Sequence, residues 1–155
     1  MKLEKTKFDY VMQGLSLLCL LLTSLYLLFN WGNIDSLIPG HFNSNGIINR
    51  MADKSEILIT LAAGWIMVVG MLIISKFPKI WNVPVLVDKD NQESVYRITK
   101  HLLESEMLIL SINFSFLSLY PLTSKNMPPY YTPLFLGLVF GVMIIYLIKL
   151  LRARS

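Results

Sequence analysis

Four long apolar runs constrain this chain more than any other feature of its sequence. Each holds about 20 residues, which as an α-helix spans the roughly 30 Å of hydrocarbon in a bilayer. The apolar residues are gathered into these runs and do not recur every second residue or every 3.6 residues. Only 15% of the 155 residues are charged, against about one quarter in soluble domains. The sequence therefore predicts an all-α integral membrane protein, embedded in the lipid bilayer and forming a single domain over residues 1–155.

The predicted transmembrane helices cover approximately residues 11–31, 55–75, 101–122 and 132–151. The first follows a positively charged start that is similar to that of a signal peptide. No small-residue cleavage site follows it, so we interpret it as an uncleaved span. Before the third span we expect a short amphipathic helix on the cytoplasmic membrane surface, because Asp90 and Glu93 have the spacing of a capping box.

Lys and Arg residues are distributed unequally among the segments outside the four runs. The N-terminal segment carries three, the connection before the third run carries five, and the C-terminal segment carries three. The first connection carries only Arg50 and Lys54, and the third carries only Lys125. Because cytoplasmic segments are enriched in Lys and Arg, both termini are predicted to be cytoplasmic. The first connection, residues 36–54, is then extracellular.

The composition disfavours several functional classes. The net charge of +4 comes from charges at the ends of apolar runs, so it does not indicate a nucleic-acid-binding face. The single cysteine, Cys19, cannot form a disulfide within the chain, and no Cys/His spacing typical of a zinc site is present. No recognisable catalytic motif occurs either. We expect no catalytic residues, metal or cofactor; enzymatic activity stays open, but a non-enzymatic protein is favoured.

The predicted extracellular connection contains the most distinctive polar sequence of the chain. Its Pro39-Gly40 pair predicts one turn, and its Asn45-Gly46 pair predicts a second, tight turn. Asparagine side chains in such a loop are expected to close Asx turns.

Other residues of this connection have two interpretations. In the structural one, Asp53 and Glu56 form a capping box at the start of the second helix, and Asp35, Arg50 and Asp53 form an exposed ion-pair network. In the functional one, His41 is part of a site, because an imidazole can act as an acid, a base or a ligand near neutral pH.

The order of residues here resembles the motif of a bacterial membrane-domain family of unknown function, named the HFN motif below. The family pattern is Pro, one residue, His, Phe or Trp, Asn, then Gly, an acidic residue and a closing Lys. The matching residues are Pro39, His41, Phe42, Asn43, Gly46 and Lys54. Asn49 stands where the family usually carries Asp, which disfavours a role that needs a carboxylate there. The resemblance covers about residues 11–75, and the same domain occurs in immunity proteins against the sporulation-delaying toxin of bacilli.

This resemblance implies an immunity, recognition or signalling protein of the bacterial plasma membrane. The binding residues that it implies are His41, Phe42, Asn43, Asn49 and Arg50. Phe42 would be the apolar anchor for an extracellular peptide or envelope component, and Arg50 would meet an acidic group on it.

The third predicted span is the least apolar of the four. Glu104, Ser111, Ser115 and Ser118 fall on one helical face. This face either packs against another helix or lines the polar path of a small transporter or membrane enzyme. For Glu104 and Glu106, solvation at the membrane interface is favoured over a proton relay.

The fourth predicted span contains Gly137 and Gly141 at GxxxG spacing. Glycines at this spacing let two helix backbones approach closely. They predict a packing surface for another helix, which in a homo-oligomer or a larger complex would belong to a partner.

The predicted topology can be tested by labelling in intact cells. A cysteine introduced at Ser44 should react with a membrane-impermeant reagent, whereas a cysteine introduced at Asn91 should not. Labelling at position 91 alone would invert the topology and place the His41 connection in the cytoplasm.

Overall fold

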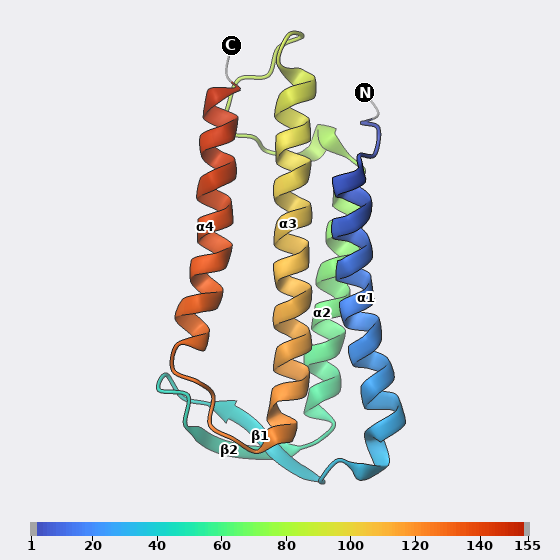
Figure 1. The fold of residues 1–155 in the computed structure, drawn as a ribbon, viewed down its shortest axis with the longest axis vertical. Helices are drawn as coiled ribbons and strands as arrows, with labels where there is room; N and C mark the ends of the chain where they lie inside the picture. The colour runs from blue at the N-terminus through green and yellow to red at the C-terminus, as the bar shows by residue number, and fades with distance from the viewer. Residues whose placement is uncertain (1–2, 154–155) are drawn as a thin grey trace.

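The computed structural model describes residues 3–153, which form four long helices and one small antiparallel sheet (Figure 1). The helices are α1 (Lys7–Asn30), α2 (Glu56–Ile74), α3 (Gln92–Leu119) and α4 (Tyr131–Arg152). The strands are β1 (Leu37–Phe42) and β2 (Ile48–Asp53). Each of the four helices is long and apolar enough to cross a membrane. The predicted all-α membrane class with four transmembrane-length helices is therefore confirmed, and the small sheet is an addition to it.

The two ends of the bundle carry different parts of the chain. Both termini and the α2–α3 connection lie at one end, named the terminal end below (Figure 1). The β1–β2 hairpin and the α3–α4 connection lie at the other end, named the hairpin end. This arrangement is the one expected of a chain that crosses a bilayer four times.

Helix α3 is the centre of the bundle, because α1, α2 and α4 each pack against it. Helices α1 and α2 also contact each other, and Figure 1 shows both on the side of α3 that faces away from α4. Hydrogen bonds supplement the apolar core: the Cys19 thiol donates to the Ser115 hydroxyl over 3.2 Å, and the Trp65 indole donates to the Ser24 hydroxyl over 3.0 Å. In lipid, apolar surface gains little from moving from a tail onto another helix, so such contacts and close packing hold helices together.

The expected surface helix before the third span is instead the first part of α3. This helix begins at Gln92 and continues without a break to Leu119, and Val95 in its first turns is fully buried. The Asp90–Glu93 capping box is also wrong, because Asn91 precedes the helix without a side-chain cap and Glu93 instead pairs with Arg97 over 3.0 Å. Burial of one face of this segment in the bundle outweighs its polar composition.

The connection expected to turn at Pro39-Gly40 is a β-hairpin in which both residues belong to β1. This predicted turn is therefore wrong. A Cβ on Gly40 would overlap the Cβ of Ala52 across the sheet, so the glycine permits close strand pairing instead of a turn.

The second predicted turn is confirmed. Gly46 has a φ of +77°, which favours glycine, and its N–H donates to the Asn43 carbonyl over 2.8 Å. The Asn43 side-chain oxygen accepts from the N–H groups of Asn45 and Ile47, both over 2.9 Å. Asn43 therefore closes the predicted Asx turn.

Helix α4 lies at the edge of the bundle, and among the described residues Leu150 is its only buried side chain (Figure 1). A Cβ on Gly137 or Gly141 would meet no atom within 4 Å. No described part of this chain therefore packs against the GxxxG surface, and its use by a partner helix stays a prediction.

Close packing predicts different outcomes for two glycines of α2. A Cβ on Gly64 would lie 2.7 Å from the Cβ of Phe114 in α3, whereas one on Gly70 would meet nothing within 4 Å. Gly64→Ala should therefore destabilise the bundle by about 1–3 kcal/mol through overpacking. Gly70→Ala, the matched control, should be neutral or slightly stabilising. Thermal unfolding in detergent measures both, and equal stabilities would contradict the close approach of α2 and α3.

Candidate functional site

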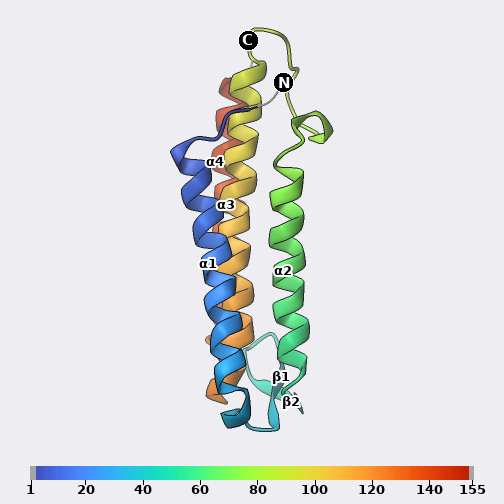
Figure 2. The same cartoon turned by 90° about the vertical axis from the view of Figure 1, so that its right-hand side faces the viewer.

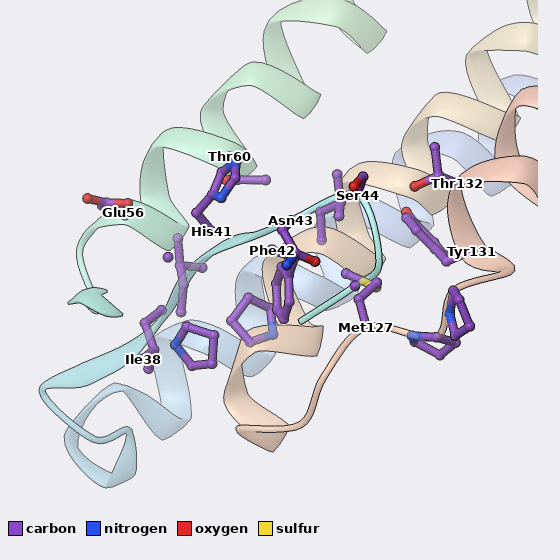
Figure 3. Close-up of a pocket in the computed structure, with 18 of the residues that line it drawn as sticks. Ile38, His41, Phe42, Asn43, Ser44, Glu56, Thr60, Met127, Tyr131 and Thr132 are labelled. Atoms are coloured by element: carbon purple, nitrogen blue, oxygen red, sulfur yellow. The ribbon is translucent and has the colours of Figure 1, made fainter. Parts of the chain in front are cut away.

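A cavity of about 400 Å³ lies at the hairpin end of the molecule (Figure 3). Strand β1 and the following turn form one wall, the first turns of α2 form another, and the α3–α4 connection with the start of α4 forms the rest. Three of the residues implied by the HFN motif, His41, Phe42 and Asn43, line it. Residues distant in sequence complete it: Glu56, Thr60, Met127, Tyr131 and Thr132. Sequence reasoning missed this second group, because only the fold brings it to the motif.

The hairpin is fixed in place by backbone contacts with the α3–α4 connection. The Met127 N–H donates to the Gly46 carbonyl over 2.7 Å, and the Ile48 N–H donates to the Asn126 side-chain oxygen over 3.0 Å. A Cβ on Gly46 would overlap the Met127 carbonyl. Phe42 also lies edge-on to Tyr120, with 6.2 Å between the ring centroids. The chain's own hydrogen bonds and ring contact therefore hold the turn, and the cavity wall that it forms, against the α3–α4 connection.

His41 is held by Asn49 on the neighbouring strand. Nδ1 of His41 lies 2.6 Å from the Asn49 side-chain oxygen. With the ring neutral, Nδ1–H donates to this oxygen and Nε2 keeps its lone pair. Asn49 therefore fixes the orientation of the imidazole, which is exposed at the rim of the cavity.

Arg50 forms a bidentate ion pair with Glu56. Its two terminal nitrogens lie 2.8 Å from the two carboxylate oxygens, and one of them also donates to the Gly40 carbonyl over 3.0 Å. Hydrogen bonding to Glu56 raises the pKa of Arg50 above its ordinary value. The expected ion-pair network with Asp35 and Asp53 is wrong, because the guanidinium faces Glu56 instead.

The expected capping box of the second helix is wrong for the same reason. Glu56 is occupied by Arg50, and the Asp53 carboxylate accepts from the Ser55 N–H over 2.9 Å. This backbone hydrogen bond lowers the pKa of Asp53. The ion pair between Arg50 and Glu56 thus joins β2 to α2 and positions the hairpin. The Arg50 guanidinium is already paired within the chain, which disfavours its expected role in contacting an acidic group on a ligand.

The polar face of α3 is buried, which agrees with the packing interpretation of its residue pattern. Ser111, Ser115 and Ser118 are at most 6% exposed, and Ser115 contacts Cys19 of α1. These serines do not line the hairpin-end cavity. Here they form a packed contact between helices.

A cluster of buried charges near the terminal end was not predicted. Nζ of Lys100 in α3 lies 2.6 Å from a carboxylate oxygen of Asp9 in α1, and Asp9 is fully buried. The Gln13 amide donates to Glu104 over 2.7 Å, and Nε2 of His101 lies 3.3 Å from Asp9. The expectation that Glu104 is solvated at the interface is wrong, because its side chain is 1% exposed.

The sequence did contain a signal for this cluster. Asp9 and Gln13 in α1, and Lys100 and Glu104 in α3, are polar pairs four residues apart. Ionisable residues in a membrane helix usually pair with one another in the bundle interior. Sequence reasoning instead assigned Lys100 to a connection outside the membrane.

Among residues 3–153, no group of three or more His, Cys, Asp and Glu side chains is arranged to hold a metal ion. Comparison of the chain with protein-family models, with curated proteins and with solved structures gave no match.

The buried pair predicts a marked asymmetry between single and double variants. Lys100→Met should destabilise the protein by about 3–5 kcal/mol, because it leaves the Asp9 carboxylate buried without its counter-charge. Asp9→Asn combined with Lys100→Met should recover most of that loss. Arg97→Met, which breaks a more exposed pair on the same helix, should cost less than about 1 kcal/mol. Thermal unfolding measures all three, and a double variant no more stable than Lys100→Met would refute this role for the pair.

Proposed function

We propose that this chain is a non-enzymatic protein of the bacterial plasma membrane that recognises an extracellular peptide or envelope component. Recognition takes place in the hairpin-end cavity, and the biological role is that of an immunity or signalling protein. The observation that carries the proposal is that His41, Phe42 and Asn43 line one cavity together with residues from α2 and α4.

The chemistry of the cavity suits a peptide. Phe42, Met127 and Tyr131 offer apolar surface for a side chain. Thr60 and Thr132 offer hydroxyls that can pair with backbone amides. A cavity of about 400 Å³ that combines apolar walls with a few polar groups is typical of a site for a small ligand or a peptide side chain.

The proposed orientation places this cavity outside the cell. The N-terminal and C-terminal segments counted above each carry three Lys and Arg residues, and the α2–α3 connection carries Lys76, Lys79 and Lys89, whereas the hairpin-end connections carry two and one. This asymmetry supports a cytoplasmic terminal end. For the labelling test, Asn91 is 6% exposed, so an unreacted cysteine there would be ambiguous. Asp90, which is exposed, is the better cytoplasmic position.

The alternative function, as a transporter or membrane enzyme with a path along α3, has less support. Such a path needs Ser111, Ser115 and Ser118 to face a cavity, and these side chains are packed against neighbouring helices.

The proposal is tested by challenging cells that lack the gene with a panel of envelope-active peptides. Loss of the gene should change sensitivity to at least one peptide, and the wild-type chain should restore it. Thr60→Phe, which fills the cavity, and His41→Gln, which removes the ring, should fail to restore it while membrane abundance stays near the wild-type level. Leu58→Phe is the matched control, because this neighbouring side chain is 47% exposed and lies outside the cavity lining.

Asn43 needs a more conservative substitution than His41. Asn43→Ala would remove both turn hydrogen bonds and loosen the hairpin, so loss of function would not distinguish recognition from folding. Asn43→Asp keeps an acceptor for both N–H groups. Unchanged sensitivity across a broad panel, or full activity of Thr60→Phe, would count against the proposal.

A further inference from the structure

A second cavity, of about 290 Å³, lies at the terminal end of the bundle. The segment before α1, the end of α2 and the buried Lys100 of α3 surround it. Figure 2 shows the N-terminal segment and the end of α2 at this same end of the molecule. Three of its described lining residues are lysines, Lys5, Lys76 and Lys100, and none is acidic.

The three lysines retain capacity to bind an anion. Lys100 is 4% exposed, and its Nζ donates one hydrogen bond to the Asp9 carboxylate. The other carboxylate near this Nζ is that of Glu104, at a distance of 4.0 Å. An ammonium group has three donors, so Lys100 can offer another to the cavity. Nζ of Lys5 donates to the neutral Gln13 side chain over 2.8 Å. Lys76 is exposed at the end of α2, beside Ser75.

The charge balance around this cavity is positive. Asp9 and Glu104 both pair with Lys100, at 2.6 Å and 4.0 Å, so the three lysines exceed these two carboxylates by one positive charge. Among the residues that the structure describes, no carboxylate forms an ion pair with Lys5 or Lys76. The two lysines at the entrance therefore have no carboxylate partner in the part of the chain that the structure describes.

The position of the cavity indicates the kind of anion. α2 ends at Ile74 and α1 begins at Lys7, so Ser75, Lys76 and Lys5 stand where apolar helix gives way to polar chain. This is the depth of lipid headgroups, and basic pockets between membrane helices bind anionic headgroups. Lysine suits a phosphate as a compact point charge with three rotatable donors.

We propose that the terminal-end cavity is a phosphate-binding site, occupied by the phosphodiester of an anionic phospholipid headgroup or by a free phosphate ion. Lys5 and Lys76 contact the phosphate oxygens at the entrance. Lys100 supplies the buried donor and is itself oriented by Asp9. Gln13, which accepts from Lys5 and donates to Glu104, links the site to the buried cluster. This site is independent of the recognition function proposed for the hairpin end.

The lipid arm of the test uses the full chain in detergent, with binding of short-chain phosphatidylglycerol and phosphatidylcholine measured by native mass spectrometry. The wild-type protein should bind phosphatidylglycerol more tightly. Lys5→Gln and Lys76→Gln should each weaken that binding about fivefold and leave phosphatidylcholine binding unchanged. Lys89→Gln, which removes the same charge from the α2–α3 connection outside the cavity, is the matched control and should bind like the wild type. Lys100 is left intact, because its pair with Asp9 holds two helices together.

The free-phosphate arm measures thermal unfolding without lipid, in inorganic phosphate and in chloride of equal ionic strength. A rise in Tm in phosphate that is lost in Lys76→Gln but kept in Lys89→Gln would assign the site to a free anion. Lysine-dependent lipid binding without this rise would assign it to a headgroup. The proposal is overturned if neither arm depends on Lys5 and Lys76, or if Lys89→Gln weakens binding as much as they do.

Discussion

The ion pair between Asp9 of α1 and Lys100 of α3 is the interaction on which the arrangement of the bundle most depends. Lipid tails are as apolar as leucine, so burying apolar surface between helices supplies little driving force. A carboxylate that is fully buried must find its counter-charge, and Lys100 lies only 2.6 Å away. This requirement permits few relative positions of α1 and α3. Because α3 also contacts α2 and α4, the position of the other helices follows from it.

At the hairpin end the constraint is different, because backbone amides rather than charges must be satisfied. The chain between α1 and α2 pairs with itself as β1 and β2, and its turn pairs with the α3–α4 connection through Gly46 and Met127. Arg50 and Glu56 then join the sheet to α2. The cavity at this end exists because two connections, the β1–β2 hairpin and the α3–α4 connection, meet there beside the first turns of α2 and α4. A fixed cavity of this kind lowers the entropic cost of ordering a binding loop.

The sequence predicted those features that depend on local composition. Runs of about 20 apolar residues suffice to identify spanning helices, and Asn45-Gly46 suffices to identify a turn. Prediction from the sequence failed for residues whose contact partner lies far away along the chain. Lys100 was assigned to a surface connection because its partner Asp9 is 91 positions away, and this error placed the start of the third helix near residue 101 instead of at Gln92. Pro39-Gly40 was assigned to a turn because the glycine's role depends on Ala52 across the sheet. For the hairpin-end cavity, the sequence indicated His41 and its neighbours in β1. It did not indicate Thr60 and Tyr131, which only the tertiary structure brings to the cavity.

Helix α4 connects the proposed recognition cavity to the packing of the bundle. Its first residue, Tyr131, lines the cavity, stacks on Phe116 at 4.5 Å between ring centroids, and donates to Asn113 over 2.6 Å. Near its other end, the Tyr146 hydroxyl lies 3.2 Å from that of Ser105. These contacts tie α4 to α3 near both of its ends. A ligand that displaced the Tyr131 ring from the proposed recognition cavity would therefore weaken the hold of α3 on the start of α4.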